Sequence, residues 1–380
     1  MLIVYRSNRA ELLAQLLAQQ LQLSAPPPFA QVEVVVNTWP TSRWLGEQLA
    51  IGIGGIAANL RFPFPGSQLR RLVDQVLDVP PSRDDPWRAS QLVWPLLELL
   101  PPLVQQPEAQ LLQRWLEERG HGSAAAGATV LDLPLWQLGR AIADAFDDYS
   151  LYRPEMVADW LAERRGPGRG QPLPPQQKWQ PLLFRQLQQR LAVLPFGLRA
   201  RNAIAQLQQA AAAGQTPAHL SALSAAGPLR LFGLSSLAPI QVELLQALSG
   251  VMTVELYLLT PCRDLWQRLE GSEAAASLTP LGEEWLLEAP RLEARFGRLG
   301  AEFQQLLEGS GASQLGSWQE QDLFLGAASA ARHQGRQPSL LEQLQQQLVQ
   351  PGSAEPLQMP PGPGVAGLEF HACPGRLRQV

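Results

Sequence analysis

The sequence predicts an α/β fold in which helices pack on a parallel sheet and a long all-helical segment interrupts that sheet. Two strand–turn–helix units follow each other within the first 50 residues, an order typical of parallel sheets. A long stretch rich in leucine, alanine and glutamine at helical spacing comes next, and strand-like sequence returns near residue 229. Two distant parts of the chain are therefore expected to contribute strands to one sheet.

Composition limits the class of protein. A chain of 380 residues exceeds one ordinary core, so at least two domains are expected. The 46% hydrophobic and 17% charged residues are typical of a soluble globular protein. The longest apolar run, 92–104, is broken by three prolines and Glu98, which argues against a membrane span. Arg6 interrupts the apolar N-terminus too early for a signal peptide, so a cytoplasmic protein is expected.

The charge and the cysteine and histidine content limit which nucleic-acid, disulfide and metal sites can be expected. The net charge is −4, so nucleic-acid binding would need a local channel lined with arginine. Cys262 and Cys373 lie far apart and are expected to be free thiols. The four histidines are scattered, and His371 beside Cys373 lacks a second pair of ligands. No metal site is predicted.

The first unit has a strand at Leu2–Tyr5, a polar turn at Arg6–Arg9 and a helix to about Leu23. Asn8 followed by Glu11 predicts a capping box at the start of that helix. In a nucleotide-binding protein this junction carries a glycine-rich loop ending in a lysine and a hydroxyl residue. The residues here are Ser-Asn-Arg, so the scaffold of a phosphate site is predicted without the site itself.

Lysine usage supports the same conclusion. Of the 30 basic residues, one, Lys178, is a lysine, and genome composition is the ordinary explanation for the arginine excess. A phosphate-binding, nuclease or Schiff-base lysine would have to be Lys178, whose Gln/Pro-rich surroundings suit none of these roles. The returning strand at 229–234 also lacks the acid that holds magnesium in a P-loop ATPase. The chain is therefore predicted to be unable to bind and polarise a triphosphate in the usual way.

The second unit has a β-branched strand at Val32–Val36, a polar turn at Asn37–Ser42 and a helix from Arg43 to about Ala50. These three elements repeat the order of the first unit. Together the two units favour a parallel sheet.

The sequence GIGGIA at 52–57 fits the dinucleotide fingerprint G-x-G-x-x-A. That fingerprint needs a strand before it and a helix after it. Here a helix precedes it, and Pro63 and Pro65 argue against a helix directly after it. We therefore predict a glycine-rich turn.

The rest of the chain alternates between helical and strand-like sequence. The final strand is followed by about one turn of helix, so the chain is expected to be the N-terminal part of a longer protein or a natural truncation. The expected elements are helices over 70–223, strands near 229–236 and 251–259 with a helix at 240–248 between them, a helix at 288–307, a Pro/Gly linker at 350–367 and a strand at 368–372.

One helix end is dense in functional groups: DAFDDYSLYRP, at 144–154, holds three carboxylates, two tyrosines and an arginine. Paired acids could hold magnesium or accept hydrogen bonds from base amino groups, and tyrosines could stack on bases. The alternative is a solvated helix end in which Arg153 pairs with an aspartate. Residue spacing alone leaves both open.

Several blocks of sequence, in order along the whole chain, carry a family resemblance. They are VYRSNRAELL at the start, SRWLGEQLA with GIAANLRFPFP at 42–65, DDYSLYRPEMVADW at 147–160, GLSSLAPIQVELLQAL at 233–248, LLTPCRDLW at 258–266, RFGRLGAEF at 295–303 and LEFHACPGRLRQV at the end. In these blocks the chain resembles the RecC family, the gamma subunits of bacterial exodeoxyribonuclease V, and it is similar to the N-terminal third of that longer family.

This resemblance implies a P-loop NTPase fold of the superfamily 1 helicase type that has lost its ATPase residues. The parallel-sheet domain would carry a large all-helical insert domain. The implied layout is an inactivated helicase-like domain at 1–69 and 228–345, a helical insert at 70–227, a linker at 346–367 and the start of a second helicase-like domain at 368–380.

The resemblance also implies a function. Such chains are subunits of an ATP-dependent helicase–nuclease that acts in double-strand break repair by homologous recombination. They carry no ATPase or nuclease residues, split the duplex, and inspect the 3′-ending single strand for the octamer Chi. ATP and magnesium would be used by RecB-like and RecD-like partners, with no cofactor and no membrane for this chain. The alternative is an assembly scaffold that holds those partners and does not read bases.

Candidate DNA-contacting residues follow from the family's Chi channel by motif. The turn NTWPTSR departs from the glutamine- and threonine-bearing form, and Arg70 stands where an aromatic is expected, so a different sequence could be read. No catalytic residue and no metal ligand is implied. The candidates are Asn37, Arg43, Phe64, Arg70, Asp144, Asp147 and Arg153.

Overall fold

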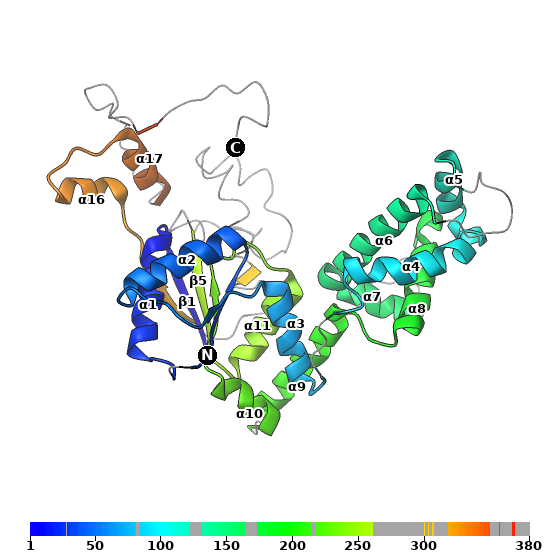
Figure 1. The fold of residues 1–380 in the computed structure, drawn as a ribbon, viewed down its shortest axis with the longest axis horizontal. Helices are drawn as coiled ribbons and strands as arrows, with labels where there is room; N and C mark the ends of the chain where they lie inside the picture. The colour runs from blue at the N-terminus through cyan, green and yellow to red at the C-terminus, as the bar shows by residue number, and fades with distance from the viewer. Residues whose placement is uncertain are drawn as a thin grey trace, which may run out of the picture. The chain divides into compact units, whose positions relative to one another are not determined.

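The chain forms two compact units in the computed structural model (Figure 1). We call them the α/β unit, made of Met1–Pro65, Gly227–Leu237 and Met252–Val380, and the helical unit, made of Gly66–Ala226 and Ala238–Val251. The structure describes residues 1–27, 29–80, 84–121, 131–163, 173–214, 217–260, 300, 303, 306–307, 318–349, 357 and 367–368.

A six-stranded parallel sheet forms the centre of the α/β unit, which confirms the predicted α/β class with a parallel sheet. The strand order is β3-β2-β4-β5-β1-β6. Strand β1 lies between two strands that follow it by roughly 250 and 320 residues, with Leu2 opposite both Val254 and Trp318. The strands are β1 Leu2–Ser7, β2 Val32–Val36, β3 Leu60–Arg61, β4 Leu229–Phe232, β5 Val254–Leu259 and β6 Trp318–Asp322.

Helices α1 (Ala10–Leu23) and α2 (Trp39–Gly52) pack together and share an apolar core with one face of the sheet. Their approach is close at one point, because a Cβ at Gly52 would lie 2.6 Å from the Cβ of Ala18. Two short helices, α16 (Ala327–His333) and α17 (Leu340–Val349), follow β6. The core on this face consists of Ile3, Tyr5, Leu13, Ala14, Leu17, Ala18, Leu21, Val32, Val34, Val36, Leu45, Leu49, Phe232 and Tyr257.

Three sequence expectations about the α/β unit are wrong in detail. The capping box at Asn8 is absent: Arg9 is the N-cap of α1 and makes no side-chain cap hydrogen bond. Helix α2 begins within the predicted polar turn, because Thr38 caps it by accepting from the Thr41 amide at 3.2 Å. Pro65 begins helix α3 (Pro65–Val76), since a proline at the first helical position costs no intrahelical hydrogen bond.

The glycine-rich turn after α2 is confirmed. Gly54 and Gly55 have φ angles of +95° and +105°, in the region that favours glycine. The expected helix at 288–307, the linker at 350–367 and the strand at 368–372 lie largely outside the described residues, as do both cysteines and His371.

The helical unit has an aromatic centre. The Phe184 ring stacks on Trp87 at 4.6 Å between centroids and contacts Phe146 at 5.1 Å and Trp160 at 5.7 Å. The apolar run at 92–104 is one helix despite three internal prolines. The further α-helices of this unit are α4 Ala89–Leu103, α5 Gln110–Glu118, α6 Leu133–Tyr152, α7 Pro154–Leu161, α8 Trp179–Leu191, α9 Phe196–Ala213, α10 Ala218–Ala225 and α11 Pro239–Ser249.

Two kinds of feature are absent from the described residues. Among the helices described, none is long and apolar enough to cross a membrane. The described part of the chain also has no group of three or more histidine, cysteine, aspartate or glutamate side chains that could hold a metal ion.

Candidate nucleic-acid interface

The turn after β1 is short and tied to the segment after β6. Only Asn8 and Arg9 separate β1 from α1. The Ser7 hydroxyl donates to the Leu323 carbonyl at 2.8 Å and accepts from the Arg9 amide at 3.0 Å. The Asn8 side chain bonds both backbone groups of Leu325, at 2.9 and 3.0 Å. The turn between β1 and α1 is thus two residues long and is held by hydrogen bonds to the segment after β6.

An ion pair strengthens the same connection. The buried Arg6 guanidinium contacts both carboxylate oxygens of Asp322, at 3.0 and 3.2 Å. Such a two-point contact holds the guanidinium in one orientation. Arg6 therefore links β1 to β6 through its side chain.

The turn after β2 places an exposed aromatic pair beside an exposed cation. Trp39, in the first turn of α2, is 75% exposed, and its ring meets that of Phe64 edge-on at 5.8 Å between centroids. Arg43 lies one helical turn further along, is exposed, and makes a distant contact with Glu47 at 3.9 Å. Asn37, at the end of β2, is half-buried. These groups could offer a stacking face and hydrogen-bond donors to a single strand.

Trp39 is a further candidate residue, which the sequence interpretation did not single out. It lies between the candidates Asn37 and Arg43, in a segment assigned to a turn. The available signal was a tryptophan followed by proline, a residue that is common in the first turn of a helix.

The acid-rich end of α6 is divided between solvent and the interior. Asp144 is exposed and pairs with Arg140 at 3.4 Å within the same helix. Arg153, directly after α6, is exposed and lies over the Tyr149 ring, 5.9 Å from its centroid. Asp147, in contrast, contacts Arg70 at 3.5 Å. The aspartates with described ion pairs at this helix end therefore pair with arginines other than Arg153.

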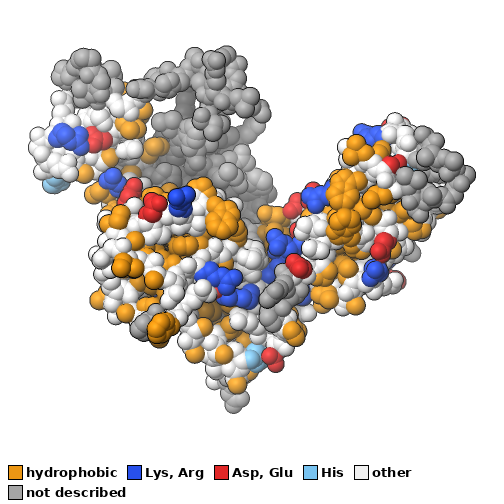
Figure 2. Space-filling view, viewed as in Figure 1, with side chains coloured by type: hydrophobic (Ala, Val, Ile, Leu, Met, Phe, Trp, Pro, Cys, Tyr) orange, Lys and Arg blue, Asp and Glu red, His pale blue; other side chains and the backbone are white. Residues whose placement is uncertain are grey.

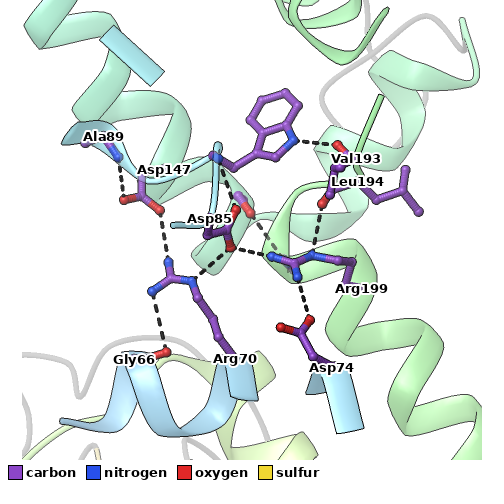
Figure 3. Close-up of polar contacts among 12 residues, drawn as sticks. Gly66, Arg70, Asp74, Asp85, Ala89, Asp147, Val193, Leu194 and Arg199 are labelled. Atoms are coloured by element: carbon purple, nitrogen blue, oxygen red, sulfur yellow. Dashed lines mark hydrogen bonds and ion pairs between the residues drawn. The ribbon is translucent and has the colours of Figure 1, made fainter. Parts of the chain in front are cut away.

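Arg70 links three segments of the helical unit (Figure 3). Its Nη2 atom lies 3.5 Å from Asp147 and its Nε 3.1 Å from Asp85. Its Nη1 makes a weak hydrogen bond, 3.5 Å long, to the carbonyl of Gly66. The guanidinium carbon is also 5.2 Å from the centroid of the Phe196 ring. Its contacts are thus internal to the protein.

Arg199, on α9, continues this set of contacts (Figure 3). It donates to Asp74 at 2.8 Å and to the Leu194 carbonyl at 3.1 Å, and it pairs with the same Asp85 oxygen that Arg70 contacts. Backbone amides also donate hydrogen bonds to two of the carboxylates in this cluster. The Trp87 amide donates to Asp85 at 3.0 Å and the Ala89 amide to Asp147 at 3.1 Å.

Burial and charge act in opposite directions in this cluster. Burial lowers the pKa of Arg70, and the carboxylates of Asp85 and Asp147 partly offset that effect. Burial raises the pKa of Asp147, and the Ala89 amide and Arg70 partly offset it. Arginine remains charged in this environment because its ordinary pKa is far above neutral.

The seven candidate residues fall into two groups. Asn37, Arg43 and Phe64 belong to the α/β unit, and the other four belong to the helical unit. Among the latter, the structure brings Arg70 and Asp147 into contact. On the face that Figure 2 shows, basic and acidic side chains lie interspersed, in keeping with the net charge of −4.

Comparison with known proteins identifies the family. The family model "RecC, N-terminal domain" matches residues 2–351. The chain belongs to the RecC family. A RecC chain of Mycobacterium tuberculosis H37Rv, named "RecBCD enzyme subunit RecC", is 30% identical over 99% of this chain and 32% of its own length. Proteins of the same name from Mycolicibacterium smegmatis and Escherichia coli K12 are each 29% identical, over 88% and 73% of this chain and 28% and 23% of their own lengths. The chain thus spans at most about a third of these RecC relatives.

Proposed function

We propose that this chain is a DNA-handling part of a RecC subunit, in a RecBCD-type helicase–nuclease that acts in double-strand break repair. In this proposal it carries no ATPase or nuclease activity of its own. It helps to split the duplex and guides and inspects the 3′-ending strand for Chi. The assignment is supported by the names of the similar proteins and by the share of this chain over which they match.

The α/β unit supports a helicase-like scaffold whose nucleotide site is lost. Its sheet is wholly parallel, and the β1–α1 turn, where a P-loop would lie, is two residues long and bonded to the segment after β6. Lys178, the one lysine in the sequence, precedes α8 in the helical unit. ATP and magnesium would therefore be used by RecB-like and RecD-like partner subunits.

The observation that carries the DNA-handling proposal is the exposed Trp39–Phe64 pair with Arg43 one turn away. Stacking of one base on an aromatic side chain contributes about 1–3 kcal/mol, and every base offers a face for it. Arg43 supplies a cation for the phosphate backbone. The two side chains are spaced four residues apart on α2, so they share one face of the helix.

Single-strand binding by the 380-residue chain tests this proposal. Fluorescence anisotropy would be measured with a labelled single-stranded oligonucleotide over a series of salt concentrations. Trp39→Ala is expected to weaken binding about 5- to 160-fold, from the loss of one stacked base. Arg43→Gln is expected to reduce the salt slope by about 0.7, from the loss of one phosphate contact.

Trp94→Ala is the matched control for Trp39→Ala. Trp94 is exposed on α4 and packs against Trp136 at 5.6 Å between centroids, so its removal exposes a comparable apolar surface in the helical unit. Equal losses of affinity for Trp39→Ala and Trp94→Ala would contradict the proposed stacking site.

The alternative function is an assembly scaffold that does not read bases. The internal engagement of Arg70 favours it, because this candidate makes its described contacts within the protein. Uniform DNA binding by all variants, together with retained co-purification with RecB-like and RecD-like subunits, would leave only this function. ATP turnover by the isolated chain would contradict both.

A further inference from the structure

Two arginines and three aspartates alternate in one connected series inside the helical unit (Figure 3). We call this series the ion network. It ties together α3, the segment before α4, α6 and α9. Its members, in order of contact, are Asp74, Arg199, Asp85, Arg70 and Asp147.

Exposure increases toward one end of the ion network. The side chain of Asp85 is 5% exposed, that of Arg70 19% and that of Asp147 30%. The inner members therefore have little access to a ligand. Asp147 is the member that a bound strand could reach most readily.

The contacts of Arg70 leave its guanidinium little freedom to bind DNA. Each of its three nitrogens lies within 3.5 Å of an oxygen, from Asp85, Asp147 and Gly66. A phosphate that drew Arg70 away would remove the arginine partner of the half-buried Asp147 and leave Asp85 with Arg199 alone. Such uncompensated charge is strongly unfavourable.

The same contacts orient the Asp147 carboxylate. One of its oxygens faces Arg70 at 3.5 Å, and the other accepts from the Ala89 amide at 3.1 Å. Each carboxylate oxygen has a second lone pair, which could accept from the amino group of a base. With two arginines and three aspartates, the ion network has a formal charge of −1, which exposed Arg88 nearby partly offsets.

We propose that Arg70, Asp85 and Arg199 are positioning residues, which hold Asp147 as an acceptor for base amino groups. In this proposal, Arg70 acts through Asp147 and does not contact DNA. The inference rests on the proposed DNA-handling function and assigns a ligand chemistry to this site: a single-stranded base with an exocyclic amino group.

Base preference measures this role directly. Cytosine offers an amino group where thymine offers a carbonyl, so the ratio of affinities for oligo-dC and oligo-dT reports the Asp147 contact. Asp147→Asn is expected to change this ratio by about tenfold, the size of one base-edge contact. Arg70→Gln and Asp85→Asn are expected to change it in the same direction, and the double variant Arg70→Gln/Asp147→Asn no further than either single variant.

Arg70→Lys separates positioning from phosphate binding. Lysine keeps the positive charge but lacks the planar fork that reaches Asp85 and Asp147 together. We expect Arg70→Lys to lose the base preference as Arg70→Gln does, with an unchanged salt slope in both. Recovery of wild-type binding by Arg70→Lys, or a slope shallower by about 0.7 in Arg70→Gln, would overturn the proposal because it indicates a phosphate contact.

Asp144→Asn is the matched control, because Asp144 lies on the same helix and pairs with Arg140 outside the ion network. Its effect should add to that of Arg70→Gln. If Asp147→Asn leaves the dC/dT ratio unchanged while Trp39→Ala still weakens binding, the positioning role is wrong and the proposed function stands. Failure of the wild-type chain to bind either oligonucleotide would overturn both. Thermal unfolding of each variant confirms that the comparison concerns folded protein.

Discussion

The side-chain amide of Asn8 forms two hydrogen bonds with the backbone of Leu325, donating to its carbonyl at 2.9 Å and accepting from its amide at 3.0 Å. This arrangement imitates the pairing of two strands and extends the contact between β1 and β6 past the end of both. The turn between β1 and α1 thereby holds the segment that follows the edge strand β6.

Asn8→Ala should therefore loosen the edge strand. Two hydrogen bonds to the Leu325 backbone are lost, so the free energy of unfolding is expected to fall by about 1–2 kcal/mol. Hydrogen exchange at the Leu325 amide should become faster. Arg9→Ala, at the exposed neighbouring position, is the control and should leave that exchange rate unchanged.

Gly197 in α9 should not tolerate a side chain. A Cβ there would lie 1.8 Å from the Ser150 carbonyl oxygen, while the Gly197 amide donates to the Ser150 hydroxyl at 3.1 Å. Gly197→Ala is expected to destabilise the protein by about 1–3 kcal/mol or more, because backbone must move to relieve the clash. Chemical denaturation followed by circular dichroism measures the change.

Gly46→Ala provides the contrast for Gly197→Ala. Gly46 also lies within a helix, but a Cβ there would meet only the Phe62 ring at 3.7 Å, an ordinary contact. The change should stabilise the protein by up to about 1 kcal/mol, since alanine is the better helix former. Equal effects at the two positions would show that the α9 helix packs differently.

Removing Arg199 should lower the free energy of unfolding, because two buried aspartates lose a positive partner. Arg199→Met keeps much of the side-chain length but leaves Asp74 and Asp85 without the guanidinium they share. Loss of one partner from a buried ion pair typically costs about 3–5 kcal/mol. Adding Asp74→Asn to Arg199→Met should recover part of that loss, as measured by denaturant unfolding, and no recovery would contradict the pairing.

The stability of the first turn of α17 should depend on pH through Glu342. Arg336 bonds both of its oxygens, at 2.9 and 2.7 Å, and the Ser339 amide donates to it at 2.8 Å. These contacts lower the pKa of Glu342 from 4.5 to about 2. Because the pKa is lowered on folding, the stabilisation is complete above pH 4.5 and is lost as the pH falls toward 2.

Nuclear magnetic resonance titration of the Ser339 amide tests this pH dependence. Its signal should shift with a midpoint near the low pKa of Glu342, and hydrogen exchange in α17 should accelerate over the same range. The Glu342 amide also donates to the Ser339 hydroxyl at 3.2 Å. In Glu342→Gln both hydrogen bonds with Ser339 can form without a titrating group, so the shift should vanish. A midpoint at the ordinary glutamate value would argue that the Arg336 contact does not persist in solution.

Local sequence signals were sufficient for the elements that bury an uninterrupted apolar face. The β-branched run Val32–Val36 is a strand over those same residues, and the leucine periodicity ends α1 at Leu23 as expected. Strand β6, with the sequence WQEQD, was not predicted because polar residues at a sheet edge do not show the pattern of a buried strand.

Long-range contacts account for most of what the sequence could not show. Asn8 has the local pattern of a helix cap, but its side chain is taken by a residue 317 positions away. Arg70 and Asp147 were candidates for DNA contact, yet their mutual ion pair depends on the packing of α3 against other helices of the unit. Side-chain partners so distant in sequence cannot be inferred from residue type and spacing in a single chain.

The position of β1 between β5 and β6 has a consequence for synthesis on the ribosome. All six residues of β1 are buried in the finished sheet, but neither neighbouring strand exists until residue 254 and beyond has been made. At roughly 5–20 residues per second this wait lasts about 12–50 s. In nascent chains the apolar β1 segment should therefore be exposed and unpaired. Chaperones are expected to bind this segment before the sheet of the α/β unit forms.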